Sequence, residues 1–122
     1  MAWQDEKLEE IEKRIELIEF RQQLLFDNDE VSRLLYEYGI TQNQYTKIMD
    51  LMDEYRKQID KGQEVNHMTF EDAIYKIVPD HTGDYHMCEY LARAFMETGR
   101  WDEVFPALYG EMNKYKYMME KK

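Results

Sequence analysis

Side chains that could bind a metal or take part in catalysis cluster only in residues 79–89, PDHTGDYHMCE. This segment contains His81, His86 and Cys88 together with three carboxylates. Imidazole, thiolate and carboxylate groups are the ligands that zinc and related transition metals prefer. The residue types in this segment therefore allow a transition-metal site.

The spacing of these ligands argues against such a site. The pattern H-x4-H-x-C matches no reliable arrangement of metal ligands. Residues two apart on a helix point about 200° apart, so His86 and Cys88 converge only if that turn is irregular. The alternative is structural: Asp84 caps a helix, Cys88 packs in the core and the histidines face solvent. We therefore predict no metal and no cofactor, and the only metal candidates are His81, His86 and Cys88.

Nucleophilic and phosphate chemistry have no recognisable motif. The only serine, Ser32, falls inside a predicted helix, and no Ser, His and Asp form a nucleophile elbow. No glycine-rich loop is present that could bind phosphate. We expect a protein that is not an enzyme, and a metal-dependent enzyme using the His81–Cys88 region is the last of three functional hypotheses.

The elements that must position these residues are helices. Glycine (5 residues) and proline (2 residues) are scarce, and no strand pattern occurs. The sequence predicts an all-α multihelical bundle of five or six helices that forms one domain over residues 1–122. We expect an N-terminal coiled-coil-type helix at 3–26 and a helical body at 28–122.

Capping residues predict where the first helices of the body begin and end. Asp27 or Asn28 caps a helix that Gly39 ends. A T-x-x-Q capping box at residues 41–44 opens the next helix, which ends at Gly62.

Similar signals divide the second half of the body. Thr69 and Asp72 repeat a cap signature before a short helix that Pro79 closes. A helix follows within residues 84–99, and a last helix runs from about Asp102 into the C-terminal tail.

Residues 3–26 carry the most informative pattern, a heptad repeat with Leu8 at position a. Apolar residues recur three and four positions apart, with one polar exception. The a and d positions are Leu8, Ile11, Ile15, Ile18, Gln22 and Leu25. The repeat predicts a coiled-coil helix that associates with other helices.

Charges beside this seam favour a parallel homo-oligomer. The g positions are Lys7, Arg14 and Arg21, and the acidic e positions are Asp5, Glu12 and Glu19. In a parallel coil, a g residue meets the following e residue of the neighbour. Lys7 then faces Glu12 of a second chain, and Arg14 faces Glu19. Both pairs attract when identical chains associate.

The residues at a and d also bear on the number of chains. Leucine at a with isoleucine at d, and isoleucine at both positions, favour trimers or tetramers over dimers. Leu8 and Ile11 form the first layers, and Ile15 and Ile18 form the next, so we expect a trimer. Gln22 is the polar residue that could fix the register.

A second apolar stripe lies on the other side of the same helix, at Leu17, Phe20 and Leu24. One stripe can face partner chains while the other faces helices of the same chain. The alternative is that both stripes are buried within one subunit, as in a central bundle helix.

Net charge and cysteine content bound the partners and the compartment. The formal net charge of −10 disfavours nucleic acids and anionic membranes as partners. The single cysteine cannot form an internal disulfide, so we expect a cytoplasmic protein. The second functional hypothesis is an acidic inhibitor that binds a basic site on another protein, for example in a phage–host setting.

The chain resembles the YhaI-like family, small helical proteins of unknown function from Gram-positive bacilli. The resemblance spans most of the chain and rests on four segments: EKLEEIEKRIELIE, LLYEYGITQNQYTKIMDLMDEY, HMTFEDAIYKIV and FMETGRWDEVFPAL. It implies a helical fold and no activity or functional residues. The first hypothesis is therefore a non-catalytic, homo-oligomeric interaction or regulatory protein.

Overall fold

The computed structural model describes residues 2–112 and 114, and these residues form helices and turns without any strand. The helices are α1 (Ala2–Asp27), α2 (Glu30–Glu37), α3 (Gln42–Asp60), α4 (His67–Ile77), α5 (Tyr85–Glu97) and α6 (Val104–Tyr109), with a 3-10 turn at Pro79–His81. The predicted all-α multihelical fold is confirmed. None of the helices in the described part of the chain is both long and apolar enough to cross a membrane.

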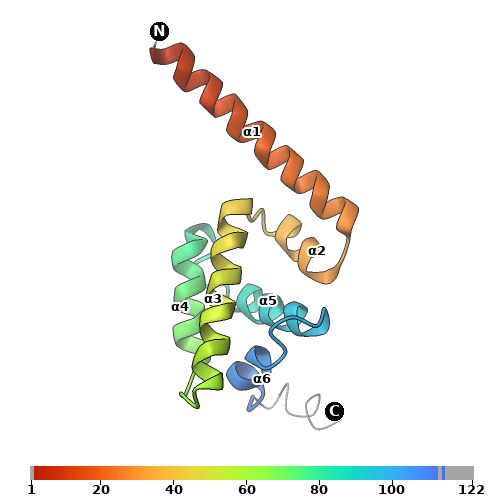
Figure 1. Ribbon diagram of the computed structural model, residues 1–122, viewed down its shortest axis with the longest axis vertical. Helices are drawn as coiled ribbons and strands as arrows, with labels where there is room; N and C mark the ends of the chain where they lie inside the picture. Colours follow the sequence, from red (N-terminus) through yellow and green to blue (C-terminus); the bar gives the residue numbers. More distant parts are fainter. Residues whose placement is uncertain (1, 113, 115–122) are drawn as a thin grey trace.

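The helices α2 to α6 pack together as a body, and α1 projects away from it (Figure 1). Helix α5 is the centre of this body, because eight of its thirteen residues are buried. The ring of Phe95 on α5 stacks parallel to that of Tyr45 on α3, with centroids 6.4 Å apart. It also meets the ring of Trp101 edge-on at 5.0 Å.

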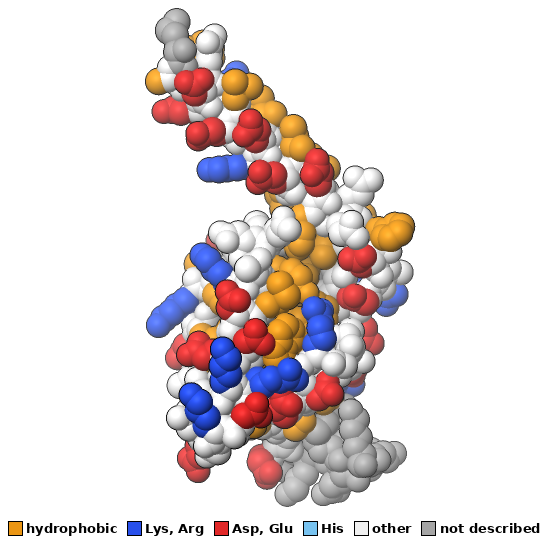
Figure 2. Space-filling model, viewed as in Figure 1, with side chains coloured by type: hydrophobic (Ala, Val, Ile, Leu, Met, Phe, Trp, Pro, Cys, Tyr) orange, Lys and Arg blue, Asp and Glu red, His pale blue; other side chains and the backbone are white. Residues whose placement is uncertain are grey.

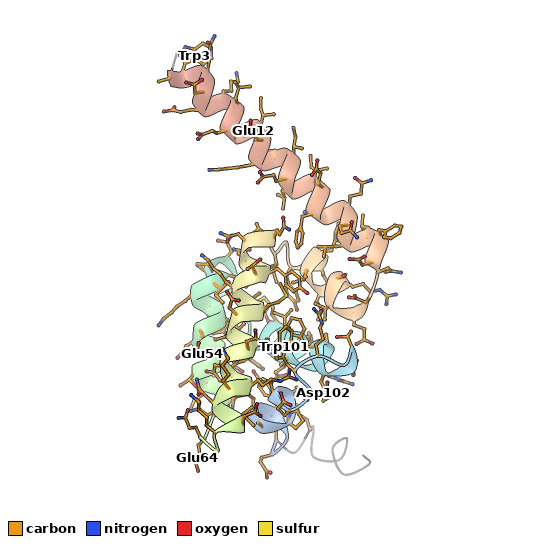
Figure 3. The ribbon with its side chains drawn as sticks, in the orientation of Figure 1. Trp3, Glu12, Glu54, Glu64, Trp101 and Asp102 are labelled. Carbon is orange, nitrogen blue, oxygen red and sulfur yellow. The ribbon has the colours of Figure 1, made fainter. Side chains whose placement is uncertain are left out.

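The loop between α5 and α6 is held against α3. The indole N–H of Trp101 donates a hydrogen bond of 2.7 Å to Oδ1 of Asp53 on α3, and Figure 3 shows the Trp101 side chain beside that helix. Arg56 of α3 forms an ion pair with Glu103. Within this loop, Trp101 has a left-handed backbone conformation, with a φ of 51°. A bulky residue rarely adopts this conformation, so the contacts must offset its strain.

The capping box predicted for α3 is confirmed. The backbone N–H of Gln44 donates to Oγ1 of Thr41 at 3.2 Å, and the N–H of Thr41 donates to Oε1 of Gln44 at 3.0 Å. Just before this cap, Gly39 ends α2 with a φ of 66°, as predicted.

Three predicted helix starts are wrong. Helix α2 is capped by Asp29, whose Oδ1 accepts the Ser32 N–H at 2.7 Å. Asn28 cannot cap it, because Asn28 ends α1 in the left-handed region with a φ of 48°. Helix α4 is capped by Asn66, so Thr69 lies inside its first turn.

The third error concerns the last helix. It begins at Val104 rather than near Asp102, because the loop turns sharply at Trp101. It also ends at Tyr109, and residues 110–112 form a turn and a bend instead of continuing the helix as predicted. The tail beyond residue 112 lies outside the described residues, except for Lys114.

Removing the α3 cap should destabilise the protein. We expect Thr41→Ala to lower the free energy of unfolding by about 1 kcal/mol, the usual cost of losing an N-cap hydroxyl. Urea denaturation at one fixed protein concentration measures this change. The matched control is Thr46→Ala in the same helix, because the exposed Thr46 hydroxyl only donates to the Gln42 carbonyl within the helix. Equal stability of the two variants would contradict the importance of the cap.

Candidate protein-interaction surface

Helix α1 is exposed to solvent on all sides over most of its length. Residues 2–19 are all exposed, and only residues 20, 21 and 24 are partly or fully buried. At 1.5 Å per residue, this exposed stretch is about 27 Å long. Trp3 near its end and Glu12 near its middle lie well away from the other helices (Figure 3).

Three side chains attach α1 to the body. Leu24 is only 4% exposed. The ring of Phe20 lies 6.3 Å from that of Tyr45 on α3. The guanidinium of Arg21 lies over the ring of Tyr36 on α2, 4.3 Å from its centroid. In the heptad register, Leu24 is at c, Phe20 is at f and Arg21 is at g, so the body covers the side of α1 opposite the a/d seam.

Leu17, the third member of the predicted second stripe, stays exposed. It borders a hollow of about 720 Å³ between α1 and the start of α3, whose other lining residues are polar or charged. The second stripe therefore contacts the body only at its C-terminal end.

The a/d seam is free along the whole helix. The exposed fractions of its apolar residues are Leu8 57%, Ile11 45%, Ile15 48%, Ile18 63% and Leu25 59%. Gln22, the polar a residue, is exposed as well. Figure 2 shows hydrophobic side chains following one edge of the projecting helix. Thus the two stripes are not both buried within one subunit. Exposed apolar strips of this kind are typical of surfaces that bind other proteins.

The charged residues beside the seam make few contacts within the subunit. Within the described part of the chain, Lys7, Glu12 and Glu19 make no ion pair. Arg14 bonds Glu10 on the same helix at 2.9 Å, and both side chains are mostly exposed. Exposed pairs of this type contribute about 0.2–1 kcal/mol, so they exchange easily for other partners.

The three metal candidates lie in different surroundings. Nε2 of His81 is 2.7 Å from the Tyr38 carbonyl oxygen. The His81 side chain is half-buried, so the expectation that it faces solvent is wrong. His86 is exposed, and its ring stacks on that of Tyr90 at 5.9 Å. Cys88 is completely buried, as predicted. Among the described residues, no three His, Cys, Asp or Glu side chains are arranged to hold a metal ion.

Asp84 and Cys88 have the structural roles that the sequence predicts. Oδ1 of Asp84 accepts the Met87 N–H at 3.1 Å and caps α5. Burial raises the pKa of the Cys88 thiol to about 12, and the nearby charge of Glu71 adds to this effect. The thiol is therefore protonated at neutral pH and is a poor nucleophile and metal ligand.

The carboxylate of Glu89 is buried, which the sequence did not predict. This residue is 1% exposed, and both of its carboxylate oxygens accept hydrogen bonds of 2.9 Å from Nζ of Lys114. A buried charge needs such a partner. Glu89 follows the core residue Cys88, but its polar side chain gives no sequence signal of burial.

The chain matches no family model, no curated protein and no solved structure. Its resemblance to the YhaI-like family therefore stays a prediction.

Burial of Cys88 should protect it from alkylation. Raising its pKa from 9.0 to about 12 lowers the thiolate fraction at pH 8 by about a thousandfold. We expect iodoacetamide to modify the native protein at least a hundredfold more slowly than the urea-unfolded protein, measured by mass spectrometry. Similar rates in both states would contradict the burial of the thiol.

Proposed function

We propose that this protein is a non-catalytic interaction protein that self-associates through α1. The observation that carries the proposal is the free a/d seam of α1, on the side of the helix that the body leaves uncovered. A second copy supplies the same seam, so one surface serves both partners.

Burial of the seam supplies the driving force. Fully burying a leucine or isoleucine side chain contributes about 1.5–3 kcal/mol, and five such residues line the seam. In proteins, most of the stability of a helix comes from packing of its apolar face, which the exposed stretch of α1 lacks in the single subunit. Association therefore buries apolar surface and stabilises the projecting part of α1 together.

The charges beside the seam favour parallel chains. In an antiparallel coil, g residues face g residues and e residues face e residues. Lys7 and Arg14 would then face basic side chains, and Glu12 and Glu19 would face acidic ones. Parallel association replaces both repulsions with attractive pairs. Because isoleucine dominates the seam, we propose three chains.

Two observations bear on the rest of this proposal. A protonated, buried cysteine suits a reducing compartment, so we place the protein in the cytoplasm. Basic side chains lie among the acidic ones on the body face shown in Figure 2. This face therefore gives no specific support to the alternative of an acidic inhibitor.

Charged residues in the seam should abolish assembly. The double variant Ile11→Asp/Ile18→Asp should sediment as a 15.0 kDa monomer, whereas the wild type should sediment at a multiple of that mass. The matched control is Lys13→Asp, which changes the net charge equally at an exposed position outside the seam. A monomeric wild type, or an unaffected double variant, would contradict the proposal.

Charge reversal tests the orientation. We expect Glu12→Lys/Glu19→Lys and Lys7→Glu/Arg14→Glu each to weaken association about 5- to 30-fold at low salt, because both pairs of each interface become repulsive. Mixing the two variants should restore association in part, because two of the three interfaces in a mixed trimer join unlike variants and become attractive again. High salt should reduce all of these differences. Sedimentation equilibrium provides the measurement, in about 20 mM and about 500 mM salt. The Debye length is about 20 Å in the first buffer and about 4 Å in the second, so charges are screened strongly only in the second. Unchanged association of both variants at low salt would contradict parallel pairing.

A further inference from the structure

The last turn of α1 presents an aromatic side chain that contributes little to the subunit itself. Phe26 is 84% exposed, more than any other exposed large hydrophobic side chain in the described part of the chain. It occupies an e position, one heptad after Glu19. A phenylalanine exposed to this degree beside an apolar seam points to an unfilled contact.

The opposite flank of α1 presents a complementary surface. Arg21 is the g residue of the same segment, and its guanidinium lies on the ring of Tyr36. Both side chains are only partly buried. Because Tyr36 belongs to α2, this contact places α2 on the g flank of α1, away from Phe26. A cation lying against an aromatic ring offers flat surfaces on which a further ring can stack.

Heptad geometry brings the two flanks together in a parallel assembly. The pairing that joins Lys7 to Glu12 of the neighbour joins each g residue to the e residue five positions later. Arg21 is therefore opposite Phe26 of the neighbouring chain. Phe26 side chains also tilt toward the helix N-terminus, which is the direction in which Arg21 lies.

We infer that Phe26 of one copy docks on the Arg21–Tyr36 pair of the next, so that the body joins the interface at the base of the coil. This inference rests on the proposed self-association and names a second contact within it. The Phe26 side chain of each chain then contacts one neighbour, and its Arg21–Tyr36 pair contacts Phe26 of the other neighbour. Such a head-to-tail contact closes into a ring under the rotational symmetry of a parallel coil.

Truncating Phe26 should weaken assembly without harming the subunit. We expect Phe26→Ala to raise the dissociation constant at least about tenfold per interface, which corresponds to 1.4 kcal/mol. The unfolding of an already monomeric Ile11→Asp/Ile18→Asp chain should be unaffected by the same change. The control is Met68→Ala, which truncates another exposed apolar residue, on α4. Sedimentation equilibrium measures both dissociation constants.

Crosslinking tests the contact itself. A chain carrying Phe26→Cys is mixed with a tagged chain carrying Arg21→Cys and treated with a short bismaleimide, to which the buried Cys88 stays unreactive. We expect the mixed crosslink to dominate over crosslinks between like chains. The control pair replaces Phe26→Cys with Gln23→Cys, which is exposed at position b on the outer side of α1.

Two outcomes separate this inference from the proposed function. If the wild type assembles through the seam, but Phe26→Ala matches Met68→Ala and the mixed crosslink is no stronger than its control, the Phe26 contact alone is overturned. If the wild type is a monomer at every concentration, both the contact and the proposed function are overturned.

Discussion

Helix α1 has apolar residues on two opposite sides, and a helix cannot bury both of them against one neighbour. The body takes the side formed by Phe20 and Leu24. The side formed by the a and d residues is left exposed from Leu8 to Leu25. The remaining features of the proposed assembly follow from this division. In that proposed assembly, the bodies would stand outside the coil and the seam would be unobstructed up to its last layer, with α2 on one flank of the helix.

The described residues of the body, in contrast, pack around their own core and pair their buried polar atoms. Its core is built around α5, and the described side chains contain no buried polar atom without a hydrogen-bond partner. Even the buried Glu89 is matched by Lys114. His81 and Cys88, which were candidate metal ligands, are part of this packed body. His81 contacts the Tyr38 carbonyl oxygen, and the thiol of Cys88 is buried in the core. The exposed apolar surface of α1 therefore stands out as the feature that the single subunit does not explain.

Local signals in the sequence were sufficient to predict the all-α fold and the residues at which most of its helices stop. The capping box at Thr41 and the glycine at position 39 are examples, because each acts through its own backbone neighbours. The start of α4 was wrong because Asn66 and Thr69 offer competing cap signals, and local sequence does not rank them. The charges beside the a/d seam favoured the second stripe as the side of α1 that meets the body, and Phe20 and Leu24 do contact it. The exposure of Leu17 could not be predicted, because helical spacing does not show where the body ends along α1.

The most direct test of parallel self-association is a distance between identical positions in two chains. A nitroxide attached at Glu6→Cys, on the exposed outer side of α1, can be measured by pulsed dipolar spectroscopy. Neighbouring helices with their side chains span about 20–24 Å, and the two labels extend outward from them, so parallel chains should give an inter-label distance of about 30 Å or less. Antiparallel chains would add an axial separation of about 30 Å, so the labels would be about 40 Å apart in all. Such a long distance, or no dipolar signal at all, would contradict the parallel assembly.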